Sequence, residues 1–392
     1  MKVALVLFDW FEHGGLQRDC RRIGESLLSK GTGVTLICMH TEANVPDGFA
    51  LVKPELTGSS KKSRRKHFVD FLHEHFRDTP YDIVFGFNRV PGLDFYFAAD
   101  TCFAWKTKKE RNWFYRLSPR TRQYMQFEKA VFNPQSNTKL LMLSPMQKQE
   151  YLSCYPAASA RMIDISPGIA RDRMAGSDAQ ELRSSLREEF SVANDELFIL
   201  QVGTGYPIKG VDRSLTAIAA LHEEVRSRVR FFILGEDRRG RYMKQALQLG
   251  IAEQVNILAG RNDMPRFLQG ADLLLQPSRK ESAGMVILEA IVAGLPVLAT
   301  ETCGYAFHVT QAEAGQVIGE PYSQHEMIAV LTEMLECLDN EKGKHWQENG
   351  IAYGQQGDFY AMPDQVAELL IETVNGSKKD TNKETKTNKG VP

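Results

Sequence analysis

Short apolar runs alternate with stretches of helical hydrophobic spacing through most of this chain. Such runs, bounded by glycine, proline or polar residues, are typical of buried parallel strands, and the stretches between them are typical of connecting helices. The alternation predicts an α/β fold with two doubly wound parallel sheets. We expect strands at 2–7, 34–39, 82–87 and 139–144 in the first half, and at 197–202, 229–234, 255–258, 272–276 and 296–300 in the second.

The length of the chain, 392 residues, exceeds what one hydrophobic core usually supports. Pro167 and Gly168 stop one element and let the chain turn toward the next, which predicts a hinge near 165–169. The tail from Asn375 has almost nothing apolar to bury and is expected to be disordered. We therefore expect Rossmann-like domains at 1–165 and 166–350, a helix at 351–374 that packs back on the first domain, and a disordered tail at 375–392.

Composition and cysteine usage indicate a cytosolic globular protein. Hydrophobic residues make up 43% and charged residues 25% of the chain, and its six cysteines show no metal-ligand spacing. The first apolar run is broken by Asp9 and no cleavage site follows, so it reads as a strand rather than a signal peptide. No apolar run approaches the roughly 18 residues that span a bilayer, so any membrane contact is expected to be peripheral.

Charge is distributed unevenly between the two halves. Residues 1–165 carry 24 Lys and Arg against 17 Asp and Glu, a net of +7, whereas the rest carries 24 against 32, a net of −8. Eight cations between residues 106 and 129 are interleaved with aromatic residues, which favours a helix on an anionic leaflet over an ordinary solvated face. Nucleic acid fits poorly because no nucleic-acid motif accompanies these cations. The predicted membrane contacts are Trp105, Lys106, Lys108, Lys109, Arg111, Trp113 and Arg116.

The strongest chemical signal in the second half is a pair of glutamates, Glu281 and Glu289, at a strand-loop-helix junction. Backbone N–H groups of residues 282–285 at the helix start favour an anion such as a sugar diphosphate. Glu281 can then contact a sugar, and Glu289, about two turns further on, can accept hydrogen bonds from a ribose diol. Two acids near an ordinary helix start remain the alternative. The predicted donor-binding residues here are Glu281, Ser282, Ala283, Gly284, Met285 and Glu289.

Four positions in the first half are weaker candidates. Gly14 and Gly15 follow the first strand, where the absence of Cβ atoms lets the backbone approach a diphosphate or donor sugar; a tight turn is the alternative. Asp19 lies in the first turns of the next helix, with acceptor-binding and structural roles both open. Asp100 ends a strand-like apolar run and either points into a cleft or caps a loop.

These motifs resemble glycosyltransferase family 4. The resemblance rests on Glu281 to Glu289, on Gly203 with the segment 209–212, and on Gly14-Gly15; the segments 14–19, 86–100, 260–263 and 303–306 are similar to the members that add glucose from UDP-glucose to the first heptose of the lipopolysaccharide inner core. It covers about residues 1–373. It implies a GT-B fold, in which an acceptor-binding and a nucleotide-sugar-binding Rossmann-like domain face each other across a cleft, and transfer with retained configuration and without metal.

The resemblance also implies roles for individual residues. Glu281, Lys209 and Asp100 are the candidate catalytic residues, and Arg173, Lys209, Arg261 and Asp263 join the donor-binding set. No Asp-x-Asp is present to hold a metal on the diphosphate, so cationic side chains are expected to stabilise it. A solvated surface charge is the alternative for Lys209. The family often has an arginine before this lysine, and Ile208 departs from that pattern.

The expected partners are UDP-glucose, a lipopolysaccharide inner-core acceptor and the anionic cytoplasmic face of the inner membrane, with no cofactor and no nucleic acid. Three other functions stay open: a family 4 transferase that uses another nucleotide sugar or acceptor, a GT-B nucleotide-sugar epimerase, and a catalytically silent binding module. The epimerase needs a further acid/base set that the sequence does not show. The silent module is disfavoured because Glu281, Lys209 and Glu289 are all present.

Overall fold

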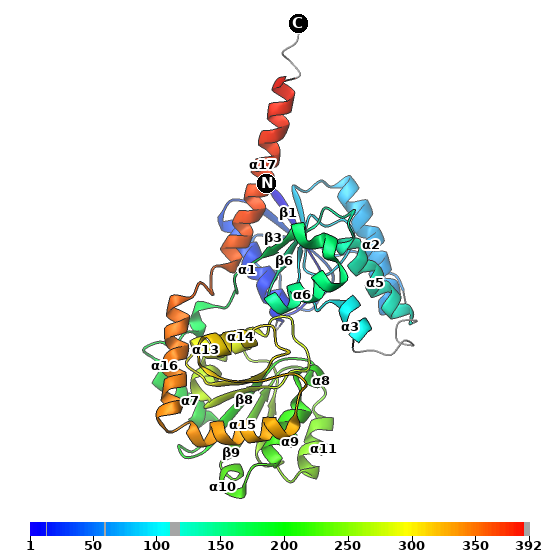
Figure 1. Cartoon of the computed structure of the whole chain (residues 1–392). Helices are drawn as coiled ribbons and strands as arrows, with labels where there is room; N and C mark the ends of the chain where they lie inside the picture. Colours follow the sequence, from blue (N-terminus) through cyan, green and yellow to red (C-terminus); the bar gives the residue numbers. More distant parts are fainter. Residues whose placement is uncertain (13, 59, 110–117, 388–392) are drawn as a thin grey trace. The chain divides into compact units, whose positions relative to one another are not determined.

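The computed structural model of the chain describes residues 1–12, 14–58, 60–109 and 118–387, with side chains to residue 376, and divides into two compact units (Figure 1). Unit 1 comprises Met1–Gly168 and Ala361–Pro392, and unit 2 comprises Ile169–Tyr360. Each unit is built on one fully parallel sheet with helices on its faces. The predicted α/β class with two doubly wound sheets is therefore confirmed.

Unit 1 holds a seven-stranded sheet in the order β3-β2-β1-β4-β5-β6-β7. The inner strand β1 is buried at every position from Val3 to Phe8, as expected of a strand with helices on both sides. Its strands are β1 (Lys2–Trp10), β2 (Gly33–Thr41), β3 (Phe49–Val52), β4 (Ile83–Gly86), β5 (Phe95–Phe97), β6 (Lys139–Met142) and β7 (Met162–Asp164). Its helices are α1 (Gly15–Ser29), α2 (Lys61–Asp78), α3 (Phe103–Lys109), α5 (Pro119–Phe132), α6 (Pro145–Cys154), the 3₁₀ turn η1 (Pro156–Arg161) and α17 (Met362–Thr387).

Unit 2 holds a six-stranded sheet in the order β10-β9-β8-β11-β12-β13. Apolar side chains of β8, β9 and β11 are buried on both faces, between separate sets of helices. Its strands are β8 (Leu197–Val202), β9 (Val229–Leu234), β10 (Val255–Leu258), β11 (Leu273–Gln276), β12 (Val297–Thr300) and β13 (Gly315–Ile318). Its helices are η2 (Arg171–Arg173), α7 (Ala179–Glu189), α8 (Tyr206–Lys209), α9 (Val211–Ala219), α10 (Glu223–Arg226), α11 (Gly240–Gln248), α12 (Met264–Gly270), α13 (Met285–Val292), α14 (Ala306–Gln311), α15 (Gln324–Cys337) and α16 (Glu341–Gln356).

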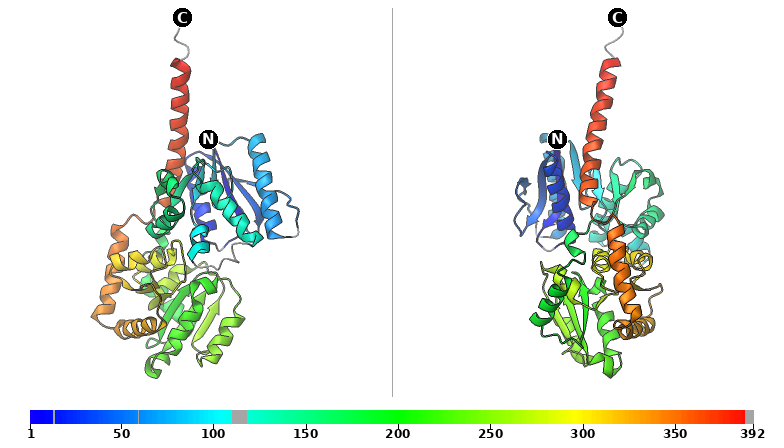
Figure 2. Two further views of the ribbon diagram at one scale, coloured as in Figure 1. Left: turned by 45° about the vertical axis from the view of Figure 1, so that its right-hand side comes forward. Right: turned by 90° about the vertical axis from the view of Figure 1, so that its left-hand side faces the viewer.

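The C-terminal helix α17 belongs to unit 1, where it lies beside α1 (Figure 2). Leu370 and Val366 enter the same core as Ile23 of α1, and Ser26 of α1 donates a 2.5 Å hydrogen bond to Asp364. The single helix expected over 351–374 is two elements in the structure, because α16 ends at Gln356 in unit 2 and α17 begins at Met362.

Helix α17 continues to Thr387, over residues for which the sequence predicts a disordered tail; the last five residues lie outside the described part of the chain. Adding a residue to an existing helix needs only one further backbone hydrogen bond and no tertiary packing. Burial of Leu370 and Val374 in unit 1 anchors the first half of this helix. A segment with nothing to bury can therefore extend it.

Candidate functional site

The candidate donor site lies at the carboxyl edge of the sheet of unit 2, where the loops after β8, β11 and β12 meet. Lys209 ends the short helix after β8, and its ammonium contacts the Oε1 atom of Glu281, in the loop after β11. Ser278 donates a 3.0 Å hydrogen bond to the other carboxylate oxygen. The side chains of Lys209 and Glu281 are 15% and 16% exposed, so the pair is reachable from solvent yet held in place. The structure thus brings together two predicted site residues that are 72 positions apart.

Glycines after β8 let Lys209 reach this position. At Gly203, with φ +138°, an added Cβ would lie 2.3 Å from Cε of Lys209. At Gly210, with φ +69°, it would lie 2.1 Å from the carbonyl oxygen of Pro277. Gln201, 1% exposed, donates a 2.7 Å hydrogen bond to the carbonyl of Lys209. Backbone conformations that suit glycine therefore place the ammonium against the loop that carries Glu281.

The position before Lys209, where the sequence departs from the family pattern, is occupied by a half-exposed side chain: Ile208 is 48% exposed. Its carbonyl accepts a 2.7 Å hydrogen bond from the backbone of Arg279, which brings a second cation next to this loop. The guanidinium of Arg279 is held by both carboxylate oxygens of Asp212, at 2.8 and 2.7 Å. The contacts of Arg279 therefore hold the loop after β11 against the segment 208–212, whereas the ammonium of Lys209 contacts Glu281.

Helix α13 begins where the sequence predicts a helix start, at Met285, after Gly284 in the left-handed region at φ +88°. Backbone hydrogen bonds join the preceding loop to the segment after β12. The N–H of Glu281 donates to the carbonyl of Thr302 at 3.1 Å, and the N–H of Tyr305 donates to the carbonyl of Ala283 at 2.6 Å. Ser282 and Ala283 are each 7% exposed. The first N–H groups of a helix lack intrahelical acceptors, so this start can receive an anion next to Lys209 and Glu281.

Glu289 lies on α13, 4% exposed, with its Oε1 atom 3.7 Å from Nε of Arg173. Because the helix begins at Met285, Glu289 lies just over one turn from its start. Arg173, on η2, also donates a 2.8 Å hydrogen bond to Asp172. Two residues expected to bind different parts of the donor are thus paired with each other in the structure.

Arg261 and Asp263 form a separate ion-pair network beyond β10. Asp263 accepts hydrogen bonds from Arg261, at 2.8 and 2.7 Å, and from Arg266, at 2.9 Å, and Glu189 contacts both arginines. The hydrogen bond from Arg261 is the main cause that lowers the pKa of Asp263. The structure therefore gives both residues partners of their own and does not bring them into contact with Lys209 or Glu281.

Unit 1 contains a cavity of about 190 Å³ at the carboxyl ends of β1 and β4. Its walls contain both aromatic and polar residues, and Asp100 and Arg89 both line it. Sugars are bound by such combinations of ring faces with carboxylates, amides and guanidinium groups, which meet the hydroxyl groups of the ligand. The lining residues are Phe8, Asp9, Phe11, Leu16, Gln17, Arg65, Asn88, Arg89, Asp100, Tyr124 and Phe127.

The other predicted residues of unit 1 lie around the first turn of α1. Gly14 is the N-cap, where an added Cβ would come 1.8 Å from Oε1 of Gln17, so the close approach expected of this glycine is to its own helix. An added Cβ on Gly15 would meet nothing within 4 Å. Asp19 is buried, 7% exposed, one turn into α1, with Arg18 3.9 Å away. Asp19 does not line the cavity, so its predicted acceptor role gains no support from its position.

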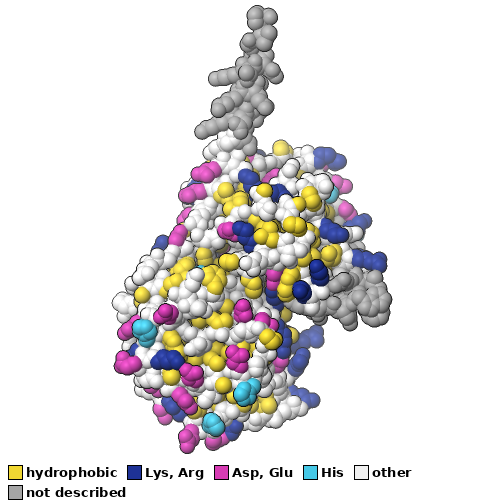
Figure 3. Space-filling model, in the orientation of Figure 1, with side chains coloured by type: hydrophobic (Ala, Val, Ile, Leu, Met, Phe, Trp, Pro, Cys, Tyr) yellow, Lys and Arg dark blue, Asp and Glu magenta, His cyan; other side chains and the backbone are white. Residues whose placement is uncertain are grey.

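The predicted membrane segment is described in part. Trp105, Lys106, Lys108 and Lys109 lie on α3, whereas Arg111, Trp113 and Arg116 lie outside the described residues. Lys and Arg side chains gather over the edge of unit 1 formed by α2 and α5 (Figure 3). A groove of about 360 Å³ next to α3 is lined by Met125, Arg122 and Lys129 of α5. No helix in the described ranges is long and apolar enough to span a bilayer.

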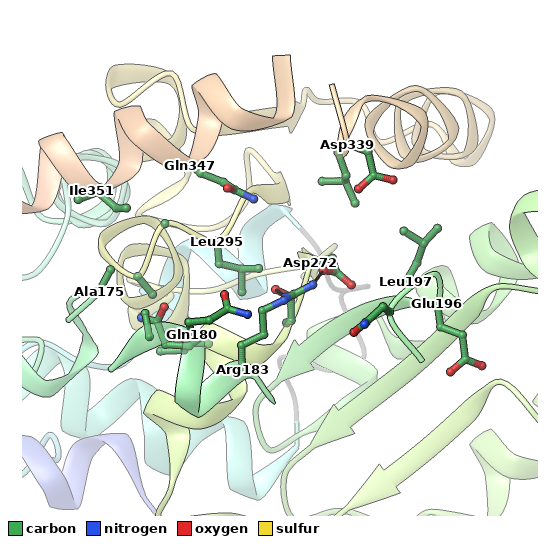
Figure 4. A pocket seen from close by; sticks show the side chains of 18 of the residues that line it. Ala175, Gln180, Arg183, Glu196, Leu197, Asp272, Leu295, Asp339, Gln347 and Ile351 are labelled. Carbon is green, nitrogen blue, oxygen red and sulfur yellow. Dashed lines mark hydrogen bonds and ion pairs between the residues drawn. The ribbon is translucent and has the colours of Figure 1, made fainter. Parts of the chain in front are cut away.

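A further cavity, of about 350 Å³, lies in unit 2 at the amino edge of the sheet (Figure 4). Ligands of open α/β sheets bind at the opposite, carboxyl edge. Arg183, directed into this cavity, already donates to Asp272 at 2.5 Å and to the carbonyls of Gly270 and Ala271. Arg183 is thus already engaged with partners of its own, and the cavity lies at the edge of the sheet opposite to Lys209.

Several residues at these sites escape prediction from the sequence: Ser278, Gln201, Asn88 and Arg89. Each follows or ends a strand at the carboxyl edge, which is the one signal that could have found them. Within the described part of the chain, no three His, Cys, Asp or Glu side chains are grouped so as to hold a metal ion.

His308 on α14 gives unit 2 a pH-dependent stability. Burial lowers the pKa of this imidazole from 6.5 to about 4, and its Nδ1 atom lies 2.7 Å from the hydroxyl of Tyr353. Because the folded pKa is depressed, the contribution is complete above pH 6.5 and is lost as the pH falls toward 4. We expect the free energy of unfolding to fall by about 2 kcal/mol more in the wild type than in His308→Gln between pH 7.5 and 5.

Denaturant titrations of both proteins at the two pH values measure this difference. Equal losses in wild type and variant would show that His308 is protonated as readily in the folded chain as in the unfolded one.

Comparison with known proteins places the chain in a family. The sequence profile of the family "Glycosyl transferases group 1" matches residues 183–353. The chain is 36% identical over 376 residues to the lipopolysaccharide glucosyltransferase WaaG of Escherichia coli K12, covering 96% of this chain and all of the relative. The crystal structure of a WaaG superposes with a TM-score of 0.91 at 36% identity, over 94% of this chain and 99% of that one.

A more distant structure, Anabaena Alr3699/HepE in complex with UDP-glucose, shares the fold with a TM-score of 0.71 at 18% identity, over 96% of this chain and all of that one. Its identity is too low to carry more than the fold. The near-complete match to WaaG, together with the two parallel sheets, shows that the chain belongs to the group 1 glycosyltransferases, which have the GT-B fold.

Proposed function

We propose that this protein transfers glucose from UDP-glucose to the first heptose of the lipopolysaccharide inner core, with retained configuration and without a metal ion. The observation that carries the proposal is the contact between Lys209 and Glu281 beside the start of α13. The acceptor and the sugar come from the likeness to the lipopolysaccharide glucosyltransferase, which extends over 96% of the chain.

The donor half of the reaction follows from the charges at the edge of unit 2. As the glycosidic bond breaks, negative charge grows on the departing diphosphate and positive charge on the anomeric carbon. The ammonium of Lys209 and the N–H groups at the start of α13 stabilise the negative charge on the diphosphate, because these donors are fixed in position before the reaction. The carboxylate of Glu281, held by Ser278, orients Lys209 and lies where it can accept hydrogen bonds from the hexose.

Glu289 and Arg173 contribute to the same site in this proposal. Glu289 accepts hydrogen bonds from the ribose hydroxyls, and Arg173, 3.7 Å from it, sets the direction of its carboxylate. Arg261 and Asp263 are assigned a supporting role, because their network joins the loop after β10 to α7 and α12.

We place Asp100 with the acceptor. Its side chain is 41% exposed and lines the aromatic cavity of unit 1, where a carboxylate can bind sugar hydroxyls. The leaving phosphate then helps to remove the acceptor proton, which accounts for retention without a covalent nucleophile. Leu16 and Gln17, the two residues that follow Gly14 and Gly15, line the same cavity.

Transfer is expected to continue in excess chelator. Cationic side chains and a helix start supply the charge stabilisation that a divalent ion gives in other transferases. Initial rates of glucose transfer in EDTA and in added Mg²⁺ or Mn²⁺ should agree within about twofold, a spread of under 0.5 kcal/mol. Loss of transfer in EDTA that either metal restores would refute metal independence.

Binding to membranes is expected to require anionic lipid. Three lysines of α3, Lys106, Lys108 and Lys109, lie in the basic half of the chain, and each cation near an anionic surface contributes about 1 kcal/mol. Replacing all three with glutamine should weaken binding to anionic vesicles by about a hundredfold. Co-sedimentation at low and high salt measures the effect, which should shrink as salt screens the charges.

The matched control replaces three exposed lysines of unit 2, Lys244, Lys342 and Lys344, with glutamine. It removes the same charge and should leave vesicle binding unchanged. Equal losses in both triple variants, or equal binding of the wild type to zwitterionic and anionic vesicles, would return α3 to an ordinary solvated face.

The donor is identified by a panel. Purified protein is incubated with heptose-terminated lipopolysaccharide and, in turn, UDP-glucose, UDP-galactose, UDP-N-acetylglucosamine and GDP-mannose. Transfer from UDP-glucose should exceed that from each of the others. A preference for another donor would leave a transferase of this family with a different substrate, and interconversion of the nucleotide sugars without transfer would indicate an epimerase.

A further inference from the structure

A fully buried carboxylate joins α3 to the sugar-binding cavity of unit 1. Glu128, on α5, is 0% exposed. It accepts hydrogen bonds from the N–H groups of Phe103 and Ala104, at 2.7 and 2.8 Å, at the start of α3, and from the hydroxyl of Tyr155 at 3.0 Å. Burial of a charge costs free energy unless it is paired and hydrogen-bonded. These contacts, together with that of Arg89, meet this requirement.

Arg89 extends the connection from Glu128 to the cavity. It is 7% exposed and contacts Glu128 through Nη1, while its Nη2 atom lies 3.5 Å from Oδ2 of Asp100. Its Nη1 atom also donates to the carbonyl of Thr101 at 3.2 Å and to Tyr151 at 3.3 Å. Burial lowers the pKa of this guanidinium, but nearby tyrosines and carboxylates raise it, and the net shift is upward. Arg89 is therefore a permanent cation between two carboxylates.

We propose that Glu128 is a positioning residue for the acceptor: it fixes Arg89, and through Arg89 it holds Asp100 in the orientation that binds the sugar hydroxyls. This inference rests on the proposed function and adds a residue that does not itself line the cavity. The same carboxylate accepts hydrogen bonds from the first turn of α3, and α3 is the helix that carries the proposed membrane-binding lysines. The position of that helix and the orientation of Asp100 are consequently set by one group.

The geometry explains why a charge is needed at this point. Asp100 is 41% exposed. Besides Arg89, the described residue whose side chain contacts its carboxylate is Tyr96, through a hydroxyl 3.4 Å away. A carboxylate with one close cation takes its direction from that cation, and Arg89 in turn takes its own from the buried Glu128. Loss of the charge on Glu128 removes one of the two carboxylates that attract Arg89, so its guanidinium shifts toward Asp100. A displacement of about 1 Å in a substrate-binding group can cost about a hundredfold in rate.

The test is Glu128→Gln, which keeps the volume and one acceptor oxygen but removes the charge. We expect the acceptor KM to rise about tenfold or more, kcat to change less than KM, and UDP affinity, a property of unit 2, to stay at the wild-type value. Tyr155→Phe is the matched control, because it removes a different hydrogen bond to the same carboxylate and leaves Arg89 paired. Its acceptor KM should stay within about twofold of wild type.

A double-mutant cycle separates positioning from general destabilisation. Glu128→Gln and Asp100→Asn should be strongly non-additive in kcat/KM for the acceptor, since they act through one chain of contacts, whereas Tyr155→Phe and Asp100→Asn should be additive. Additive losses in the first pair, or an unchanged KM in a folded Glu128→Gln protein, would overturn the proposal.

A further arm does not depend on the proposed function. The Nε–H signal of Arg89 in NMR spectra of the wild type should shift in Glu128→Gln and again in Asp100→Asn, and stay in place in Tyr155→Phe. If the wild type proves to use another acceptor, the cycle is run with that acceptor. If no acceptor is found, the proposed function fails. If the Nε–H signal of Arg89 also stays in place in both Glu128→Gln and Asp100→Asn, the proposed link from Glu128 through Arg89 to Asp100 is overturned as well.

Discussion

Replacing Lys209 with alanine is expected to lower turnover by about 30- to 1000-fold, or about 2 to 4 kcal/mol of transition-state stabilisation. Its ammonium is fixed by Glu281 next to the start of α13, so in the proposed mechanism it stabilises the leaving diphosphate without reorganising during the reaction. Because the charge on the diphosphate grows as the bond breaks, the loss should fall mainly on kcat. Steady-state rates with varied UDP-glucose measure it.

The control for this prediction is Lys244→Ala, which removes an exposed lysine from α11 of the same unit and should leave the rate unchanged. Circular dichroism and thermal unfolding establish that both variants are folded. A folded Lys209→Ala protein with a nearly normal kcat would mean that the diphosphate leaves from another part of the unit.

Replacing Glu289 with glutamine is expected to weaken UDP binding by about ten- to a hundredfold. Hydrogen bonds to a charged group contribute about 1.5 to 3 kcal/mol, and glutamine keeps the shape of the side chain while it removes the charge. The substitution also weakens the interaction with Arg173, which is 8% exposed, so the free energy of unfolding should fall as well. Calorimetric titration with UDP and denaturant unfolding measure the two effects separately.

An exposed glutamate of the same unit, Glu326, serves as the comparison, and Glu326→Gln should alter neither quantity by more than about 0.5 kcal/mol. Wild-type UDP affinity in Glu289→Gln would remove Glu289 from the donor site and leave its pairing with Arg173 as a purely structural feature.

Long apolar runs made most of the fold predictable. β1 and β8 are built around continuous runs of buried residues, β9 is buried except at Arg230, and the sequence pattern identifies each of them. β7 has only three residues, too few to establish a period, and β13 opens with Gly315 at φ +150°. Short strands like these are defined by their neighbours in the sheet, which the sequence does not reveal.

The contacts at the candidate sites were likewise predictable from the sequence only in part. Lys209 and Glu281 each follow a strand, and the carboxyl ends of parallel strands share one edge, so their proximity was predictable. The connection between Arg89 and Glu128 was not, because a glutamate on a helix is usually solvated. Its only signal is spacing: Glu128 lies between Phe127 and Val131, on the apolar face of α5.

The neighbours of Arg261 and Asp263 were equally invisible in the sequence. A motif suggests that these residues serve the donor, but it does not show that Glu189, 72 positions away, already pairs with Arg261. A resemblance to a family indicates which positions of a chain match the family's motif. The ion pairs at those positions depend on the side chains that surround them in the folded chain.

The structure of the transfer product tests the central claim most directly. Purified protein is incubated with ¹³C-labelled UDP-glucose and heptose-terminated inner-core lipopolysaccharide, and the product is analysed by mass spectrometry and NMR. The proposed function predicts a single added glucose, α-linked to the first heptose, because retention preserves the configuration of the donor. A β-linked product, a glucose on another sugar, or no transfer while a different donor or acceptor is used would contradict it.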